Sequence, residues 1–515
     1  MKLNYKRTIL VGFAFFLIQA FWQAYDATIA LTLTNKFGMD QFWSGVVMAL
    51  DNILALFLLP LFGAFSDRCK SKSGRRSPFI RIGTIIAAIA LVLLSFADNL
   101  QLKQIDKVSN VDDPAALSVI YDTQKDKTLM TPNGTEFTLQ EQFPDKDDFL
   151  AIRSANDAEV KGNRDESSRP YTNYVVPARQ AYAADATANN PTYLIAFIVI
   201  LLILLVAMGI FRSPAVALMP DVTIKPLRSK GNAVINLMGS AGGILVLVLG
   251  MGFAFNISGA KNAMMSYTGY FSVIATVMLA ALFIFHTKVK EPLWAAEMEA
   301  DTIRYGIEED EEEKPKEAQK MSREQKRSLL LILLSVALWY FGYNAVTSKY
   351  SVYASNILIK DYSLTMLIAQ GAAIVAYLPA GMIASKIGRR KSILAGVVML
   401  TVSFLVASFM RAGSPDVLMY AMFALAGIAW ATINVNSFPM VVELCSGANV
   451  GKYTGFYYTA SMAAQTLTPM LSGYLMDNIA DTALFPYATV FVALAFVTMF
   501  FVKQGDAKSD TALEA

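Results

Sequence analysis

The chain is dominated by long apolar segments, each about as long as a helix that crosses a membrane. Such a helix needs about 20 mainly apolar residues to span the hydrocarbon core. Twelve segments of the 515-residue sequence meet this requirement. Their approximate limits are 8–34, 43–66, 79–97, 192–219, 230–256, 267–287, 327–354, 363–385, 391–411, 416–442, 451–476 and 482–503. The pattern predicts an all-α, polytopic protein with twelve transmembrane helices in the lipid bilayer of a plasma membrane or bacterial inner membrane.

The composition agrees with this prediction and excludes several classes of protein. Hydrophobic residues make up 55% of the sequence and charged residues only 17%, which is too apolar for an ordinary soluble protein. One histidine, two cysteines and no phosphate-binding loop leave no constellation for catalysis. We therefore expect no enzymatic activity, no cofactor, no metal site and no nucleic-acid partner. Cys69 and Cys445 fall in loops expected to be cytoplasmic, where thiols stay reduced, so we expect no disulfide.

The basic residues orient the chain in the membrane. Segments rich in Lys and Arg alternate with short loops that carry about one basic residue each. The rich segments are residues 2–7, 68–76, 225–230, 288–327 and 386–391. Because basic loops are retained in the cytoplasm, both termini are expected on the cytoplasmic side.

Repeated loop sequences indicate two related halves. The loop after the second span runs from Gly63 through Asp67-Arg68 to Arg75-Arg76, and a shortened copy at residues 381–391 places Arg389-Arg390 at the matching position. In the same way, span four ends at an acid after a Ser-Pro pair, and span ten ends at an acid after Ser-Phe-Pro. Two copies far apart in a hydrophobic chain are typical of transporters built from internal repeats. The charged residues at these helix ends are expected to act in gating and topology: Asp67, Arg68, Arg75, Arg76, Asp221, Arg389, Arg390 and Glu443.

The charge distribution also divides the chain into parts. A charged segment between spans six and seven predicts a cytoplasmic linker, partly an amphipathic helix. The expected parts are a first six-helix bundle at residues 1–97 and 192–287, an insert at 98–191, a linker at 288–326, a second six-helix bundle at 327–503 and a cytoplasmic tail at 504–515.

The insert at residues 98–191 is polar and should lie outside the cell. The alternating sequences at residues 117–121 and 135–139 favour short strands, and residues 132–134 (Pro-Asn-Gly) favour a hairpin turn. We expect a small exported domain, with a disordered loop as the alternative.

Few ionisable residues lie deep inside the spans. They are Asp26, Asp51 and Arg212, and each is a functional candidate because a charge in hydrocarbon costs about 2.5–3.5 kcal/mol. A carboxyl group in a low-dielectric site can exchange a proton near neutral pH, as proton coupling requires. Arg212 should pair with Asp26 or Asp51, or donate to a substrate, and protonation of the acid would release it. The alternatives are an acid that caps or snorkels at the membrane boundary and a purely structural ion pair.

Uncharged polar residues suggest what the spans enclose. Gln19, Gln23 and Asp26 fall on one face of the first span, with Trp22 at its edge. This stripe fits either a wet cavity or a buried hydrogen-bonded seam between helices. Aromatic rings beside amides suit a sugar, because the rings stack on C–H faces and the amides bond hydroxyl groups. The further candidates of this kind are Asn232, Asn236, Tyr343 and Asn344.

The first loop resembles a known family. Residues 66–69 (SDRC) and 74–80 (GRRSPFI) are similar to the SDRC and GRRRPFI sequences of sucrose-proton symporters. These belong to the glycoside-pentoside-hexuronide:cation symporter group of the major facilitator superfamily, whose signature G-x-x-x-D-R-x-G-R-R this loop also resembles. In span four, Arg212, Ala217-Leu218 and Asp221 resemble the arginine, Ala-Leu and Asp of that branch. The resemblance implies two pseudo-symmetric six-helix bundles with the major facilitator fold.

The chain departs from the family pattern at informative positions. The related melibiose branch carries acids one and five residues before the proline of span two, where this chain has Leu59 and Ala55. This favours H⁺ over Na⁺ as the coupling ion. Ser77 replaces the third arginine of the loop, and the large insert is not typical of the family.

Together these observations predict a secondary active transporter. The expected activity is proton-coupled import of a sugar, an α-glucoside disaccharide such as sucrose or maltose, by alternating access in a monomer. Asp26, Asp51 and Arg212 are expected to couple the proton. The expected sugar contacts are Gln19, Trp22, Gln23, Asp26, Arg212, Asn232, Asn236, Tyr343 and Asn344. The alternatives are an uncoupled facilitator, a drug-proton antiporter, and a membrane sensor that uses the insert.

Overall fold

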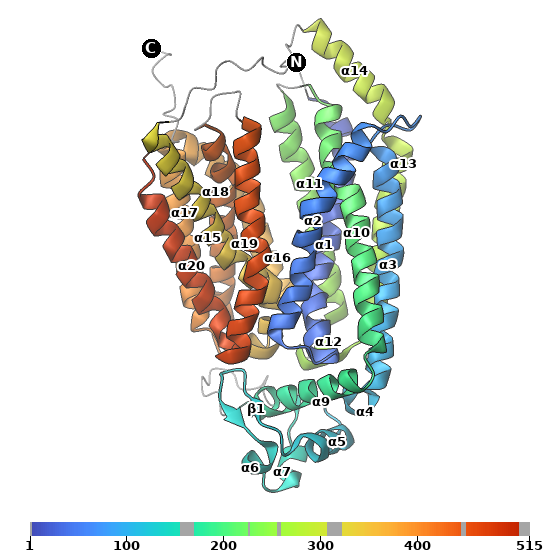
Figure 1. Cartoon of the computed structure of the whole chain (residues 1–515), viewed down its shortest axis with the longest axis vertical. Coiled ribbons are helices and arrows are strands. Elements are labelled where there is room, and N and C mark those ends of the chain that lie inside the picture. The colour runs from blue at the N-terminus through green and yellow to red at the C-terminus, as the bar shows by residue number, and fades with distance from the viewer. Residues whose placement is uncertain are drawn as a thin grey trace.

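The computed structural model describes residues 3–154, 169–224, 227–254, 259–305, 322–443 and 450–503. Its long helices form two bundles side by side, with a small domain at one end (Figure 1). The first bundle contains α1 (Tyr5–Leu31), which continues as the π-helical turn η1 (Thr32–Lys36), α2 (Gln41–Asp67), α3 (Ser77–Gln104), α10 (Thr192–Asp221), α11 (Arg228–Ala254) and α13 (Thr268–Lys288). The second contains α15 (Arg323–Tyr353), which continues as the π-helical turn η5 (Ala354–Leu358), α16 (Tyr362–Ile387), α17 (Arg389–Ser408), α18 (Asp416–Glu443), α19 (Val450–Asn478) and α20 (Leu484–Phe500).

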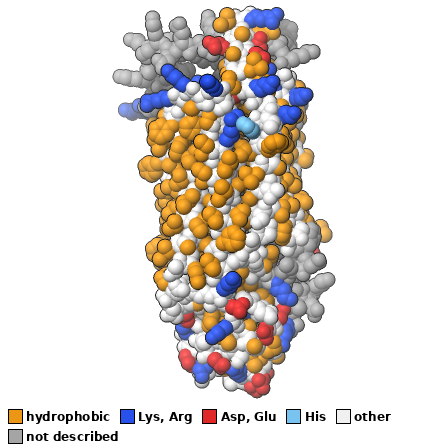
Figure 2. All heavy atoms as spheres, turned by 90° about the vertical axis from the view of Figure 1, so that its right-hand side faces the viewer, with side chains coloured by type: hydrophobic (Ala, Val, Ile, Leu, Met, Phe, Trp, Pro, Cys, Tyr) orange, Lys and Arg blue, Asp and Glu red, His pale blue; other side chains and the backbone are white. Residues whose placement is uncertain are grey.

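These twelve helices coincide with the twelve predicted spans. Ten of the described helices are long and apolar enough to cross a membrane, and α16 adds a shorter apolar stretch, Tyr362–Tyr377. Each bundle has its own hydrophobic core. Figure 2 shows hydrophobic side chains covering the middle of one face, with Lys and Arg gathered toward the end where α1 begins. The exposed apolar residues of α3, such as Ile82, Ile89 and Phe96, contribute to such a band, as expected of a surface in lipid.

The two ends of the molecule differ in what they carry. One end holds the start of α1, the loop at residues 68–76 and the helix α14 (Glu291–Arg304), and we call it the basic end. The other end holds the small domain between α3 and α10, and we call it the insert end (Figure 1). Within the predicted linker, α14 is helical as expected, and residues 306–321 lie outside the described part.

The insert is a folded domain rather than a disordered loop in its described part. Its helices are α4 (Asp106–Ser109), α5 (Pro114–Gln124), α6 (Leu139–Gln142), α7 (Lys146–Leu150) and α9 (Val176–Asn189), the last preceded by the π-helical turn η3 (Tyr171–Val175). Two short antiparallel strands, β1 (Leu129–Met130) and β2 (Glu136–Phe137), pair Leu129 with Phe137. A separate hydrophobic core holds these elements together.

One prediction for the secondary structure of the insert was wrong. Residues 117–121 are helical because Asp113 caps the backbone N–H of Ala115 and Pro114 begins α5, while Leu117, Ile120 and Tyr121 form one buried face. The alternation of apolar residues had favoured a strand. The turn at residues 132–134 does join two strands, as predicted.

The boundary between α3 and the insert was also placed too early. α3 continues to Gln104 instead of ending at residue 97, because Asp98 is buried within the first bundle. Its two carboxylate oxygens each lie 2.7 Å from Nζ of Lys36. Lys36 also donates to the carbonyl oxygen of Met265 at 2.7 Å and lies 3.9 Å from the ring centroid of Tyr267. The predicted first span ended at residue 34 and so left Lys36 outside it.

We predict that this ion pair stabilises the first bundle. Lys36→Ala should lower the free energy of unfolding by about 3–5 kcal/mol, because it leaves the buried carboxylate of Asp98 without its partner. The double substitution Lys36→Met with Asp98→Leu should recover most of the loss. Unfolding in detergent micelles measures both. As a control, Lys360→Ala removes the exposed pair with Asp416 and should cost at most about 1 kcal/mol. Equal losses for the two lysine variants would contradict the prediction.

Candidate functional site

The intramembrane charges of the first bundle lie close to one another. Asp26, Asp51 and Arg212 come from α1, α2 and α10, and all three are half-buried. Arg212 and Asp51 interact electrostatically, as do Asp26 and Asp51. The guanidinium carbon of Arg212 lies 5.5 Å from the ring centroid of Trp22. Asp51 is therefore the electrostatic partner of Arg212 that sequence analysis had sought.

This charged cluster faces the second bundle. Asp26 interacts electrostatically with Tyr343 of α15 and Tyr362 of α16. Arg212 interacts in the same way with Tyr458 of α19. The indole N–H of Trp22 is buried and finds no acceptor among the described residues. A buried donor without a partner is costly, so this N–H is a natural contact for a polar ligand.

Aromatic side chains of the second bundle lie opposite these charges. The rings of Tyr343 and Trp430 stack with centroids 3.6 Å apart and planes 3° apart. Tyr340 meets Trp430 edge-on at 5.3 Å. Asn344, one residue after Tyr343, donates to the carbonyl oxygen of Tyr340 at 3.0 Å. The wall that faces Asp26 is thus a rigid aromatic surface with an amide beside it.

The polar residues on one face of α1 were expected to line either a wet cavity or a buried hydrogen-bonded seam, and they differ in their surroundings. Gln23 is buried and donates to the hydroxyl of Tyr362 at 3.1 Å, while it accepts a hydrogen bond from Gln370 of α16. Here it forms the hydrogen-bonded seam between the bundles. Gln19, by contrast, is exposed.

The two asparagines of α11 lie apart from this seam. Both Asn232 and Asn236 are exposed, and the side chain of Asn236 donates to the carbonyl oxygen of Asn232 at 2.9 Å. This hydrogen bond lies within their own helix.

The two bundles are in close contact at the insert end. A β-carbon at Gly45 of α2 would lie 2.1 Å from the carbonyl oxygen of Pro469 of α19, and one at Gly473 would lie 2.2 Å from that of Gln41. Toward the basic end the bundles diverge (Figure 1), and Gly455 of α19 has no atom within 4 Å of a β-carbon position. The closed contact therefore lies on one side of the charged cluster only.

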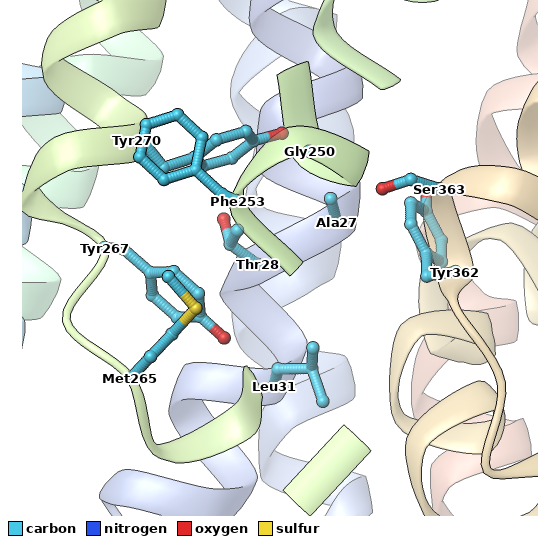
Figure 3. A pocket seen from close by; sticks show the side chains of 10 residues that line it. All are labelled: Ala27, Thr28, Leu31, Gly250, Phe253, Met265, Tyr267, Tyr270, Tyr362 and Ser363. Carbon is cyan, nitrogen blue, oxygen red and sulfur yellow. The ribbon is translucent and has the colours of Figure 1, made fainter. Parts of the chain in front are cut away.

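A small cavity marks this closed contact (Figure 3). It has a volume of about 40 Å³ and lies between α1, α11 and the residues before α13 on one side and the start of α16 on the other. Tyr267, Tyr270 and Tyr362 line it together with Ser363. The space suffices for a few water molecules, because a cavity volume of about 10–15 Å³ on this measure holds one.

Four of the charged residues at the helix ends of the first bundle, Asp67, Arg75, Arg76 and Asp221, form one cluster at the basic end. Arg75 donates to both carboxylate oxygens of Asp221, at 2.7 and 3.1 Å. Arg76 donates to Asp221 at 2.7 Å and pairs with Asp67 at 2.5 Å. The loop thus connects the end of α10 to the end of α2. Arg68 is exposed to solvent.

Sequence analysis missed the residue that anchors this loop. Glu291, at the start of α14, accepts hydrogen bonds from the backbone N–H of Arg76 at 2.8 Å and of Ser77 at 2.7 Å, and from the Ser77 hydroxyl at 2.6 Å. Gly74 has φ of 108°, and a β-carbon there would lie 2.2 Å from Glu291. Both the positive φ and the close approach of Glu291 require glycine at position 74. The acid followed by proline at 291–292, a helix start, was the available signal.

The second bundle repeats part of this arrangement. Gly388 has φ of 93° directly before Arg389 and Arg390, as Gly74 does before Arg75-Arg76. Arg390 donates to the carbonyl oxygen of Phe500 at the end of α20. α18 ends at Glu443, and the side chain of Glu443 lies outside the described part.

Comparison with known families identifies the fold. A model described as Major Facilitator Superfamily matches residues 357–515, and one described as MFS/sugar transport protein matches residues 10–103. The two matches fall in the second and first bundles respectively. The chain is therefore similar to members of the major facilitator superfamily over these two segments.

The curated proteins that are similar to this chain include sugar transporters. The sucrose transport protein SUC4 of Arabidopsis thaliana is 34% identical over 80 residues, 16% of either chain. The proton-associated sugar transporter A of Mus musculus is 41% identical over 71 residues, 14% of this chain and 9% of the relative. The alignments therefore span less than a fifth of the length of these relatives. They support the resemblance to the sucrose-proton symporter branch.

Solved structures share the fold at low sequence identity. The inward open conformation of the xylose transporter XylE from E. coli superposes with a TM-score of 0.60 at 14% identity and covers 98% of both chains. The nucleoside transporter NupG superposes with a TM-score of 0.52 at 14% identity, over 97% of this chain and 100% of that one. Each relative and structure named here is a transporter, in agreement with the prediction that the chain is not an enzyme.

We predict that Glu291 holds the first loop in place. Glu291→Ala should lower the free energy of unfolding by about 1–3 kcal/mol, because two backbone N–H groups and a hydroxyl lose their acceptor. The matched control is Glu297→Ala on the same helix, which removes only an exposed pair with Arg7 and should cost at most about 1 kcal/mol. Thermal unfolding in detergent compares them, and an effect at Glu297 as large as that at Glu291 would overturn the assignment.

Proposed function

We propose that the chain is a proton-coupled sugar importer that carries an α-glucoside disaccharide of the sucrose or maltose type. The observation that carries the proposal is the placement of Asp26, Asp51 and Arg212 opposite the aromatic wall of Tyr343 and Trp430, at the interface between the two bundles. An interface of this kind, near the middle of the membrane, is where secondary transporters bind substrate and coupling ion.

The aromatic wall supports a sugar as substrate. Sugars present C–H faces that pack on aromatic rings and hydroxyl groups that need donors and acceptors. The stacked pair Tyr343–Trp430 offers the first, and the open N–H of Trp22 together with Arg212 and Asp26 offers the second. The restriction to an α-glucoside rests on the similarity to sucrose transport proteins.

The electrostatic attraction between Asp51 and Arg212 supports coupling to H⁺. With Asp51 ionised, its charge attracts the guanidinium of Arg212. When a proton binds the carboxylate, that attraction ends and Arg212 becomes free to donate to sugar hydroxyls. Loss of the proton on the opposite side restores the pair and weakens sugar binding. Asp26 repels Asp51 when both are charged, so the two acids are coupled in this cycle.

The closed contact at the insert end fits release of substrate at the basic end. If the basic end faces the cytoplasm, as the basic loops favour, the observed conformation is the one that delivers sugar inward. Import then requires an alternate conformation open at the insert end. Sodium is a poorer fit because Ala55 and Leu59 stand where the melibiose branch has acids.

We predict that substitution of Asp51 uncouples transport. In proteoliposomes with an acidic exterior, the native protein should accumulate labelled sucrose or maltose. Asp51→Asn should abolish gradient-driven accumulation but keep exchange of sugar across the membrane at equal pH, because the neutral side chain resembles the protonated acid. Asp26→Asn and Arg212→Gln, tested in parallel, should impair accumulation. Asp416→Asn, an exposed acid at the insert end, is the control. Unaltered accumulation in Asp51→Asn would refute this role.

We predict that the aromatic wall sets the apparent affinity for sugar. Tyr343→Ala should raise the KM for uptake by about two- to tenfold, since a stacking contact is worth roughly 0.5–1.5 kcal/mol and 1.4 kcal/mol is tenfold. Tyr343→Phe keeps the ring and should change KM little. A KM that responds equally to both variants would indicate that the hydroxyl of Tyr343, rather than its face, contacts the sugar. Uptake kinetics of the two variants side by side decide the matter.

A further inference from the structure

The insert is fixed to the first bundle by buried polar contacts. Gln101 near the end of α3 donates to the carbonyl oxygen of Lys36 at 2.8 Å and to the hydroxyl of Thr187 of α9 at 3.0 Å. Gln180 of α9 donates to the side chain of Asn35 at 3.2 Å. The core of the insert also includes Met264, from the short helix α12 (Gly259–Met264) that precedes α13. The insert therefore moves with the first bundle.

The hairpin of the insert reaches across to the second bundle. The turn between β1 and β2 contains Gly134, whose φ is 86°. A β-carbon at Gly134 would lie 1.9 Å from the carbonyl oxygen of Ile479 and 3.3 Å from the β-carbon of Ala480. These two residues form the turn between α19 and α20. Only glycine permits both the backbone conformation and the close approach at this position.

The same turn of the second bundle also holds the first bundle directly. Asp477, two residues before Ile479, accepts hydrogen bonds from the backbone N–H groups of Gln41 at 2.8 Å and Phe42 at 2.6 Å. Lys349 of α15 is fully buried and donates to the carbonyl oxygen of Gln41 at 2.5 Å. The first turn of α2 is therefore bonded to two helices of the second bundle.

The hairpin and these hydrogen bonds surround one cavity of about 140 Å³ at the insert end. Thr131 and Pro132 of the insert, Gln41 of the first bundle, and Asp477 and Asp481 of the second bundle all line it. Three parts of the molecule thus meet where the two bundles must separate for the insert end to open.

We propose that the insert is a clasp for this end of the carrier. Its hairpin, carried by the first bundle, presses on the turn at residues 479–480 and favours the conformation closed at the insert end. Opening at that end parts Gly134 from Ile479 and frees Gln41 from Asp477 and Lys349. The clasp sets the balance between the two conformations. It depends on alternating access but on neither the identity of the sugar nor the coupling ion.

Distance measurements between spin labels test the clasp without transport. One pair joins the insert to the second bundle, with labels at the exposed residues Asp126 and Val417, and the other joins it to the first bundle, with labels at Asp126 and Trp43. Cys69 and Cys445 are first replaced by serine. Gly134→Val should increase the fraction of long Asp126–Val417 distances several-fold, because the side chain clashes with Ile479.

Two controls interpret these distances. The Asp126–Trp43 distances should not change in Gly134→Val if the insert stays attached to the first bundle. Gly252→Val makes the same substitution where a β-carbon meets no atom within 4 Å, and it should leave both pairs unchanged. An unchanged Asp126–Val417 distribution in a Gly134→Val protein that keeps its Asp126–Trp43 distances would overturn the proposal.

A cross-link tests the clasp by holding the hairpin in place instead of displacing it. The result is informative even if Gly134→Val distorts the hairpin. Asn133→Cys with Ile479→Cys, joined by a cleavable bifunctional thiol reagent, should hold the insert end closed and abolish the long Asp126–Val417 distances. Cleavage of the reagent should restore them. Long distances that persist in the cross-linked protein would overturn the clasp. Loss of sugar uptake in liposomes with retained distance changes would instead point to a failure of the proposed transport function.

Discussion

An unpaired polar group in hydrocarbon costs free energy, and this cost determines where charged side chains lie in this protein. Lys36 is paired with Asp98, and Lys349 donates to the backbone at Gln41. Both lie near the insert end, where they hold helices together. Arg212 is treated differently, because it meets an acid only through a longer-range attraction and lies beside an indole with an open N–H. The closely paired lysines hold helices together, whereas Arg212, which is paired only at longer range, remains available to interact with a ligand.

The two bundles repeat one design with different partners. In each, a glycine with positive φ precedes an Arg-Arg pair at the start of a helix. In the first bundle the pair binds Asp221 and Asp67, and the loop is capped by Glu291 of α14. In the second, Arg390 reaches the end of α20. The loop motif therefore has the same backbone feature in both halves, but its arginines contact different partners in each half.

Hydropathy was sufficient to predict the helices of the membrane domain, because the length of each span is set by the bilayer. It was insufficient for the insert, where the alternating residues 117–121 suit a strand as well as a helix and only the cap at Asp113 separates the two. The charged cluster was predictable because Asp26, Asp51 and Arg212 stand out in apolar surroundings. Lys36 and Glu291 were missed, since each lies next to a loop in sequence and becomes buried only through residues far along the chain.

The first helix of each bundle ends in a π-helical turn, η1 after α1 and η5 after α15. A π turn holds one residue more than an α turn without lengthening the helix by a further turn. Its occurrence at the same place in both bundles means that the two halves match in backbone conformation at the insert end, as they do in the glycine before each Arg-Arg pair at the basic end.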